Sequence, residues 1–366
     1  MLTAKMIALL IRGMPGLAEA GWTCLSTTLP GIIAIASLLC TWPAPESPSE
    51  LLRQKMQNQD KQRYVCYYGP ETTELKNCSL AILEPANWNR KAINLLKADQ
   101  ISVIGYCSIG EAAETEAAEL FRNHGQTWGL DLDGNGNADL NGIWKSVYGD
   151  SRSQIWRDHV LKKIDKLLNM GFQGVFLDTI DTCDLSPEQP LAMAGLIREI
   201  RYRNPDIILI GNRGFGAYRA DPAILNDKVI DGVMFECFTT IHDFNLGHPR
   251  MLSKEDLLFN HVIFTDYLQP FQKKGGILLS LDYGAESGAP SEAESMSEAR
   301  SLVSIALSRA RDYGFISLIS TVNLDSVKAI EGKVSSAMIR KYGKNSMARK
   351  LNSAENTRGN SDSGEN

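Results

Sequence analysis

Two acidic residues, Asp178 and Glu236, occupy matching positions in the sequence. Each is the first charged residue at the end of a short apolar run, in GFQGVFLDTID and in DGVMFECF. Such runs are typical of strands buried on both faces, which would hold the following side chain rigidly. Two carboxylates facing one pocket can cleave a glycosidic bond, because one attacks the anomeric carbon while the other protonates the leaving oxygen. We therefore predict that Asp178 and Glu236 form a catalytic pair.

Other polar and aromatic residues follow the remaining apolar runs. Tyrosines there can stack on sugar rings, and amide or guanidinium groups suit sugar hydroxyl or acetamido groups. The candidates for substrate binding are Tyr68, Tyr106, Asn212, Arg213 and Tyr283, beside the acidic residues Glu111, Asp181 and Asp282. Two alternatives stay open. Tyr106 could pack in the core with its hydroxyl bonded, and Arg213 could neutralise Asp178 or Asp181.

The segment DLDGNGNADLNG, residues 131–142, matches most of a calcium-binding loop. The candidate ligands, at positions one, three, five, seven and nine, are Asp131, Asp133, Asn135, Asn137 and Asp139. Gly136 stands at position six, where the loop turns sharply, but position twelve is Gly142 instead of a bidentate Glu. The segment is either a structural calcium site or an Asn/Gly-rich surface turn, and neither alternative is catalytic.

Eight short apolar segments rich in Val and Ile alternate with helical patterns, which predicts a parallel sheet wrapped by helices. The predicted strands are residues 64–68, 80–83, 102–107, 174–177, 207–210, 232–235, 277–281 and 315–319. The predicted helices are residues 151–170, 187–203, 254–273 and 292–311. Eight strands close an α/β barrel, so we predict a single-domain (β/α)8 TIM-type barrel. A doubly wound open sheet is the alternative, although no GxGxxG turn follows the first strand.

This barrel would bring the catalytic pair together. Active sites of such barrels form where the strands run into their following loops. The fourth and sixth strands have one strand between them, and at about 4.8 Å per strand their backbones lie on the order of 10 Å apart. Inward-leaning side chains would close much of that gap. The spacing fits a retaining glycosidase, whose carboxyl groups sit about 5–5.5 Å apart.

Composition narrows the function classes further. The chain has 366 residues, 43% of them hydrophobic, with a net charge of −5 and no long basic run, so nucleic acid is not expected as a partner. The five His form no HxH or HExxH pair, and no GxSxG elbow occurs, which argues against a catalytic zinc or a serine nucleophile. Catalysis is therefore expected to need no cofactor, and a monomer is expected.

The two ends of the chain differ from the middle. Basic residues precede an apolar run at 29–40, which is too short for a comfortable membrane span and resembles the core of an export signal. We expect residues 1–50 to be an export signal or membrane anchor plus linker, residues 60–335 the barrel, and residues 342–366 a disordered polar tail. The protein would then be secreted, periplasmic or associated with the cell envelope.

Three segments in order, VIGYCSIGEA, WRDHVLKKIDKLLNMGFQGVFLDTID and VMFE, resemble glycoside hydrolase family 114 over roughly residues 64–330. Members of that family are described as endo-α-1,4-polygalactosaminidases, and the hydrolase domain of a Pel polysaccharide protein is related to them. The resemblance implies a barrel with Asp178 as nucleophile and Glu236 as acid/base. It also implies pocket positions for Glu111, Asp181, Asn212 and Asp282. After SIGEA this chain reads AETEAAELF, where the family often has a Tyr/Arg-rich segment, so the resemblance leaves the contacts to substrate at this segment, and with them the substrate, open.

Three functions remain open on the sequence alone. The first is endo-acting hydrolysis of a galactosamine-containing polysaccharide. The second is a non-catalytic carbohydrate-binding or biosynthetic accessory protein on the same barrel. The third is hydrolysis of a different α-glycan. Retention of both carboxylates favours an enzyme.

Overall fold

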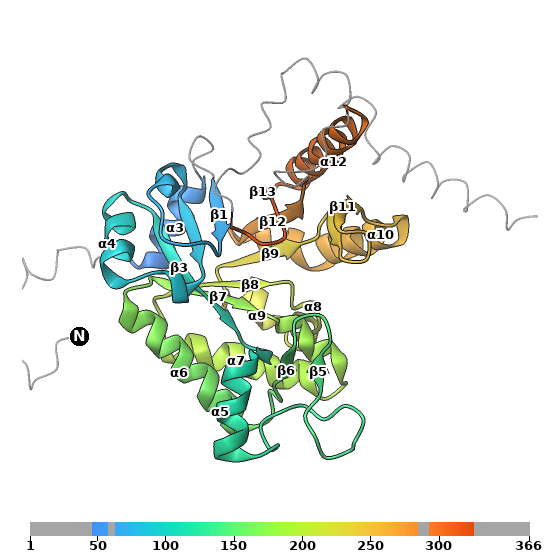
Figure 1. Ribbon diagram of the computed structural model, residues 1–366. Coiled ribbons are helices and arrows are strands. Elements are labelled where there is room, and N and C mark those ends of the chain that lie inside the picture. Colours follow the sequence, from blue (N-terminus) through green and yellow to red (C-terminus); the bar gives the residue numbers. More distant parts are fainter. Residues whose placement is uncertain (1–45, 58–62, 285–292, 326–366) are drawn as a thin grey trace, which may run out of the picture. The chain divides into compact units, whose positions relative to one another are not determined.

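The computed structural model describes residues 46–57, 63–284 and 293–325 (Figure 1). The apolar run at 29–40 and the polar tail at 342–366 lie outside these residues, as do positions 60 and 335, the predicted limits of the barrel. In the part of the chain that the structure describes, no helix has the length and apolar character needed to cross a bilayer.

All eight predicted strands are present and form one parallel sheet in chain order. They are β1 (Tyr64–Tyr67), β2 (Leu80–Leu83), β3 (Ser102–Ser108), β7 (Gly174–Asp178), β8 (Ile208–Asn212), β9 (Gly232–Glu236), β12 (Ile277–Tyr283) and β13 (Ile316–Ser320). A doubly wound sheet would reverse its order midway, so the sequential order excludes that alternative. β1 and β13 are neighbours, and the N–H of Tyr68 donates to the carbonyl of Leu324 at 2.7 Å beside them. The sheet is thus a nearly closed (β/α)8 TIM-type barrel.

Helices follow most strands. The α-helices are α3 (Pro48–Gln57), α4 (Arg90–Ala98), α5 (Glu114–His124), α6 (Gln154–Met170), α7 (Gln189–Arg203), α8 (Phe215–Ala220), α9 (Ala223–Asn226), α10 (Lys254–Ile263), α11 (Gln269–Lys273) and α12 (Ala293–Asp312). Short 3₁₀ turns are η3 (Glu74–Asn77), η4 (Pro85–Asn87) and η5 (Ile180–Leu185). The helix predicted over 254–273 is instead divided by a π turn, η6 (Phe264–Leu268). Pro270 explains the break, since it has no N–H to continue the α-helical bonding.

Side chains alternate between two cores along each strand. In β7, Phe176 lies in the barrel interior, whereas Val175 and Leu177 pack in the outer core beneath the helices. In β9, Met234 is likewise interior and Val233 is outer. Because successive side chains point to opposite faces of a sheet, the last residues of β7 and β9 also face the interior. Those residues are the two predicted catalytic carboxylates.

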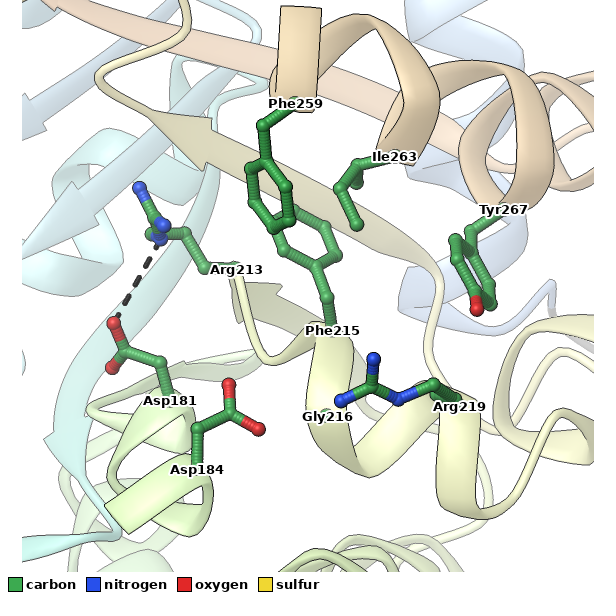
Figure 2. Close-up of a pocket in the computed structure, with 9 residues that line it drawn as sticks. All are labelled: Asp181, Asp184, Arg213, Phe215, Gly216, Arg219, Phe259, Ile263 and Tyr267. Atoms are coloured by element: carbon green, nitrogen blue, oxygen red, sulfur yellow. Dashed lines mark ion pairs between the residues drawn. The ribbon is translucent and has the colours of Figure 1, made fainter. Parts of the chain in front are cut away.

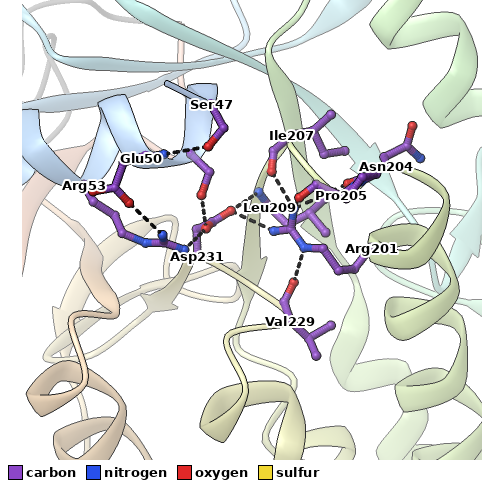
Figure 3. A network of polar contacts seen from close by, with 11 residues as sticks. Ser47, Glu50, Arg53, Arg201, Asn204, Pro205, Ile207, Leu209, Val229 and Asp231 are labelled. Carbon is purple, nitrogen blue, oxygen red and sulfur yellow. Dashed lines mark hydrogen bonds and ion pairs between the residues drawn. The ribbon is translucent and has the colours of Figure 1, made fainter. Parts of the chain in front are cut away.

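Helix α3 is bound to the barrel by a buried acid, Asp231, which lies just before β9 (Figure 3). Leu52 of this helix belongs to the interior core. Asp231 is 1% exposed and accepts hydrogen bonds from Arg53 at 2.5 Å, from Arg201 at 2.9 Å and from the N–H of Leu209 at 2.9 Å. The helix falls partly within residues 1–50, which the sequence assigned to the signal and linker. In the structure it is part of the barrel unit.

Two small antiparallel sheets extend from strand ends on the active-site side. One follows β3 and has the order β4 (Glu111–Ala112), β6 (Ser146–Tyr148), β5 (Leu140–Asn141). The other is the hairpin β10 (Thr240–Asp243) and β11 (His248–Met251), which follows β9. Neither was predicted, because strands of two to four residues carry too little periodicity to be recognised. Both leave the barrel at the end where the carboxylates lie.

Candidate active site

Asn212, the last residue of β8, connects the two predicted catalytic carboxylates. Its side-chain nitrogen donates to Oδ1 of Asp178 at 2.8 Å and to Oε2 of Glu236 at 2.7 Å. Because both bonds start at one nitrogen, the two oxygens lie at most 5.5 Å apart, the sum of the bond lengths. The structure therefore brings together the pair that the sequence singled out.

Glu236 is partly buried, and each of its two carboxylate oxygens accepts a hydrogen bond. Its Oε1 accepts the hydroxyl hydrogen of Tyr283, a residue that is 7% exposed, at 2.5 Å. Burial raises the pKa of Glu236, and the negative charge of Asp178 raises it further. Hydrogen bonds from Tyr283 and Asn212 and the charge of Arg213 act in the opposite direction. A carboxyl group with a raised pKa retains its proton to higher pH, which suits a general acid.

The three strands that end in Asp178, Asn212 and Glu236 are each followed by a residue in the left-handed conformation that is not glycine. Thr179 has φ 59°, Arg213 has φ 53° and Cys237 has φ 55°. Such conformations cost on the order of 1–3 kcal/mol each and cluster at functional sites. Sequence reasoning missed this feature because none of the three is Gly or Asn, the residues that usually signal a positive φ.

Hydrogen bonds hold these turns in place. The Oγ1 of Thr179 accepts the N–H of Gly110 at 2.8 Å and contacts the hydroxyl of Ser108 at 2.8 Å. The N–H of Arg213 donates to the carbonyl of Met234 at 2.9 Å. Each turn is thereby tied to a neighbouring strand, so the side chain preceding it has a fixed position at the rim.

Tyr68 and Tyr106 lie beside Asp178. Their rings meet edge to face with centroids 5.1 Å apart, and the ring of Tyr106 also contacts Phe176 of the interior core. Burial raises the pKa of the Tyr106 hydroxyl, and the charge of Asp178 raises it further. The ring of Tyr106 is thus packed, as one of the two alternatives predicted, with its hydroxyl next to the carboxylate, and its contact with substrate stays a prediction.

Asp181 in η5 and Arg213 face each other at 3.8 Å, so Arg213 pairs with Asp181 as one of the alternatives predicted (Figure 2). Burial of the carboxyl group raises the pKa of Asp181 to about 6, and the charges of the two catalytic candidates add to that shift. Arg213 opposes it. The Asp181 side chain is still 51% exposed, so solvent screens these interactions.

A pocket of about 80 Å³ opens next to this ion pair. Its lining residues are Asp181, Asp184, Arg213, Phe215, Gly216, Arg219, Phe259, Ile263 and Tyr267. Figure 2 shows acidic and basic groups at one side of it and the aromatic rings of α10 and η6 at the other. Apolar surface beside a few charged groups can receive a sugar ring and its polar substituents.

Comparison with known proteins settles the family. The sequence matches the model of glycoside-hydrolase family GH114 over residues 46–336. The chain belongs to glycoside hydrolase family GH114. It is therefore a glycoside hydrolase, as the strand-end motifs predicted.

Two solved structures share the GH114 chain's fold. The glycoside hydrolase domain of PelA from Pseudomonas aeruginosa has a TM-score of 0.57 at 24% identity, covering 72% of this chain and 96% of that one. Ega3 from Aspergillus fumigatus, in complex with galactosamine, has a TM-score of 0.50 at 14% identity, covering 72% and 92%. No curated protein matches the sequence. The structural likeness shows a shared barrel fold.

Two acids predicted to lie in the pocket, Asp282 and Glu111, are buried and hydrogen-bonded to neighbouring segments of the protein. Asp282 is 0% exposed, and its Oδ1 accepts the N–H groups of Thr239 at 2.6 Å and Thr240 at 2.7 Å. It is out of phase with the interior residues of β12, so it points away from the barrel axis. Glu111 is 8% exposed and accepts from Asn141 at 3.0 Å and from the hydroxyl of Ser146. Both acids position loops around the site.

The loop at residues 131–142 has some of the ligand positions expected of a calcium-binding loop. Carboxylate oxygens of Asp131, Asp133 and Asp139 lie within 4.8 Å of one another. The Oδ1 of Asn135, however, accepts the N–H of Asn137 at 2.8 Å, so this predicted ligand is engaged within the loop. Asp131 also accepts the N–H of Gly136 at 2.8 Å, a bond that lowers the pKa of its carboxyl group. The donor set fits a cation through three carboxylates and lacks the bidentate Glu.

Proposed function

We propose that the chain is a retaining endo-glycosidase that hydrolyses α-1,4-linked, galactosamine-containing polysaccharide. The observation that carries the mechanism is the shared hydrogen-bond donor Asn212. It limits Oδ1 of Asp178 and Oε2 of Glu236 to a separation of 5.5 Å or less. Retaining enzymes hold their carboxyl groups about 5–5.5 Å apart, whereas inverting enzymes leave about 6.5–9.5 Å for a water molecule.

In the first step, Asp178 attacks the anomeric carbon while Glu236 gives its proton to the glycosidic oxygen. One part of the polymer leaves, and the other part stays bound to Asp178 as an ester. In the second step, ionised Glu236 removes a proton from water, the resulting hydroxide attacks the anomeric carbon, and Asp178 is released. The chain supplies both nucleophile and proton, so no cofactor is required.

The galactosamine substrate is supported by the family resemblance and by the related Ega3 fold, which was solved with galactosamine. The rim is also suitable for a protonated amino group. Asp181 and Asp184 border the pocket beside the catalytic pair, and an ammonium group could bind such carboxylates. Arg213 and Arg219 in the same lining would instead favour hydroxyl or acetamido oxygens, which suits a partially acetylated polymer.

The test is a polysaccharide panel that includes a partially deacetylated galactosamine polymer. We expect wild type to release oligosaccharides and proton NMR to show the α-anomer first. Asp178→Asn and Glu236→Gln should each reduce kcat at least about a hundredfold. The matched control is Glu119→Gln, an exposed acid of α5.

Each other outcome points to a different function. Binding of the polymer without turnover by wild type would identify a binding or accessory protein. Cleavage of another α-glycan alone would replace the substrate, and a β-anomer product would replace the retaining mechanism. Full activity of the Asp178→Asn enzyme would overturn the assignment of the nucleophile.

We also propose that the acidic loop at 131–139 binds calcium for stability only. Its three converging carboxylates support this role. Calcium should raise the Tm of wild type and have no effect on the Asp131→Asn variant, while kcat at saturating substrate stays unchanged in both. Equal Tm values with calcium and with a chelator would contradict the proposal.

We further propose export, with the N-terminal segment as a cleaved signal or as a membrane tether, and a monomeric enzyme. A polymeric substrate outside the cell would require export. Fractionation of expressing cells with N-terminal sequencing tests the first point, and light scattering of the purified protein tests the second. Full-length protein confined to the cytoplasm, or a stable dimer, would contradict them.

A further inference from the structure

Two large aromatic residues near the active site are exposed. Trp144 is 62% exposed and Phe244 is 53% exposed. Their rings touch edge to face, with centroids 5.5 Å apart. Aromatic side chains are the largest contributors to cores and interfaces, so an exposed pair in contact calls for a role at the surface.

The pair joins two segments that are far apart in the sequence. Trp144 lies in the turn between β5 and β6, in the small sheet that follows β3. Phe244 lies at the tip of the β10–β11 hairpin, which follows Glu236. In the barrel, β7 and β8 stand between β3 and β9 and carry Asp178 and Asn212. The small sheet after β3 and the β10–β11 hairpin therefore meet beside the part of the rim that holds the catalytic groups.

Hydrogen bonds fix both the hairpin and the small sheet in position. In the hairpin, the hydroxyl of Thr240 donates to the carbonyl of Tyr283 at 2.8 Å, and the N–H of Thr240 donates to Asp282 at 2.7 Å. On the other side, Asn141 donates to Glu111 at 3.0 Å and accepts the N–H of Ile143 at 3.1 Å. The aromatic pair is thus held in position before any ligand arrives, which lowers the entropy cost of binding.

The chemistry of the pair suits an amino sugar. A pyranose ring has an apolar C–H face that stacks on an aromatic ring, while its hydroxyl groups stay in water. A protonated amino group near a Trp face adds a cation–π attraction. Leu246, 59% exposed, and Ile143, 65% exposed, are further apolar residues in the two turns that carry the rings.

We propose that Trp144 and Phe244 form an aromatic platform that binds a sugar unit of the polysaccharide away from the cleaved bond. The inference rests on the proposed function. The platform would hold a long chain while the catalytic carboxylates act on one linkage. Long substrates should therefore depend on it, and short substrates that fill only the catalytic centre should not.

The test compares a long α-1,4-galactosamine polymer with a trisaccharide of the same sugar. For Trp144→Ala and Phe244→Ala we expect KM on the polymer to rise about tenfold, with kcat on both substrates and KM on the trisaccharide unchanged. Trp144→Phe should restore most of the polymer KM, because it keeps an aromatic face. The control is Tyr202→Ala, which removes an 87% exposed aromatic residue from α7. Its KM should match wild type.

The outcomes separate this inference from the proposed function. If wild type cleaves or binds the polymer and Trp144→Ala has an unchanged KM, only the platform is overturned. If the trisaccharide kcat falls as well, the pair supports the catalytic centre and is not a remote platform. Calorimetry of the inactive Asp178→Asn protein provides a readout without turnover. If wild type neither cleaves the polymer nor binds it, both the proposed glycosidase function and the aromatic platform fail.

Discussion

The side-chain nitrogen of Asn212 donates a hydrogen bond of 2.7 Å to Glu236, and the same nitrogen reaches the second carboxylate of the site at 2.8 Å. One neutral amide thus holds two acids that would otherwise repel each other. Its own oxygen is buried and has no hydrogen-bond partner among the described residues. A buried acceptor without a partner is unusual in a folded protein.

Replacing this amide should impair catalysis more than folding. Asn212→Ala removes the donor that fixes both carboxylates, and we expect kcat to fall roughly a hundredfold, the loss typical of a preorganised polar group. Steady-state kinetics and a thermal melt measure the two effects. Asn94→Ala on the exposed face of α4 is the control. An Asn212→Ala enzyme with wild-type kcat would show that the bridge is not needed.

Tyr283→Phe should shift the basic limb of the kcat/KM profile to higher pH. The Tyr283 hydroxyl stabilises ionised Glu236 and so lowers the pKa of that carboxyl group. Without the hydroxyl this pKa rises further, and the proton that Glu236 must donate is kept to higher pH. A pH series on both enzymes gives the direction, with Tyr202→Phe as control. A limb that moves to lower pH would contradict Glu236 as the acid.

Asp282 should make the fold less stable as pH rises. Burial raises the pKa of Asp282 to about 6 from an ordinary 3.8, so the folded chain keeps a proton that the unfolded chain releases between those values. The stabilisation linked to this proton is complete below about pH 4 and is lost as pH rises through about 6. Its hydrogen bonds from Thr239 and Thr240 need only an oxygen acceptor.

Asp282→Asn keeps such an oxygen and does not titrate. Relative to wild type, the free energy of unfolding of the variant should therefore increase between pH 4 and pH 7. Urea unfolding at the two pH values measures this difference, in which the contributions of all other acids cancel to first order. A constant difference would mean that Asp282 titrates normally.

The buried acid at the far end of the barrel should carry a large share of stability. Asp231→Ala leaves Arg53 and Arg201 without their shared carboxylate, and breaking a buried ion pair typically costs about 3–5 kcal/mol. Glu50→Ala removes only the exposed partner of Arg53 and should change stability by less than about 1 kcal/mol. Chemical denaturation of both variants gives the comparison. Equal losses would show that α3 is not held by this acid.

Local patterns in the sequence were enough for the barrel and the catalytic candidates. Buried strands are continuous apolar segments, so all eight were predicted, and the charged residues that end β7 and β9 marked the two candidate catalytic acids. The same alternation could have shown that Asp282 is out of phase with the interior positions of β12. The helix over 254–273 was predicted as continuous, although Pro270 signalled the break.

Other features depend on contacts between distant residues. The bridge from Asn212, the pairing of Asp181 with Arg213 and the contact between Trp144 and Phe244 each join segments from different strand ends. The left-handed residues after the strands are held by bonds to neighbouring strands and not by their own preference. Local periodicity, which arises from burial, therefore determined the two acids and the strands that carry them. Only the tertiary structure of the nearly closed barrel decided which side chains meet, because each contact depends on how the strand ends come together in space.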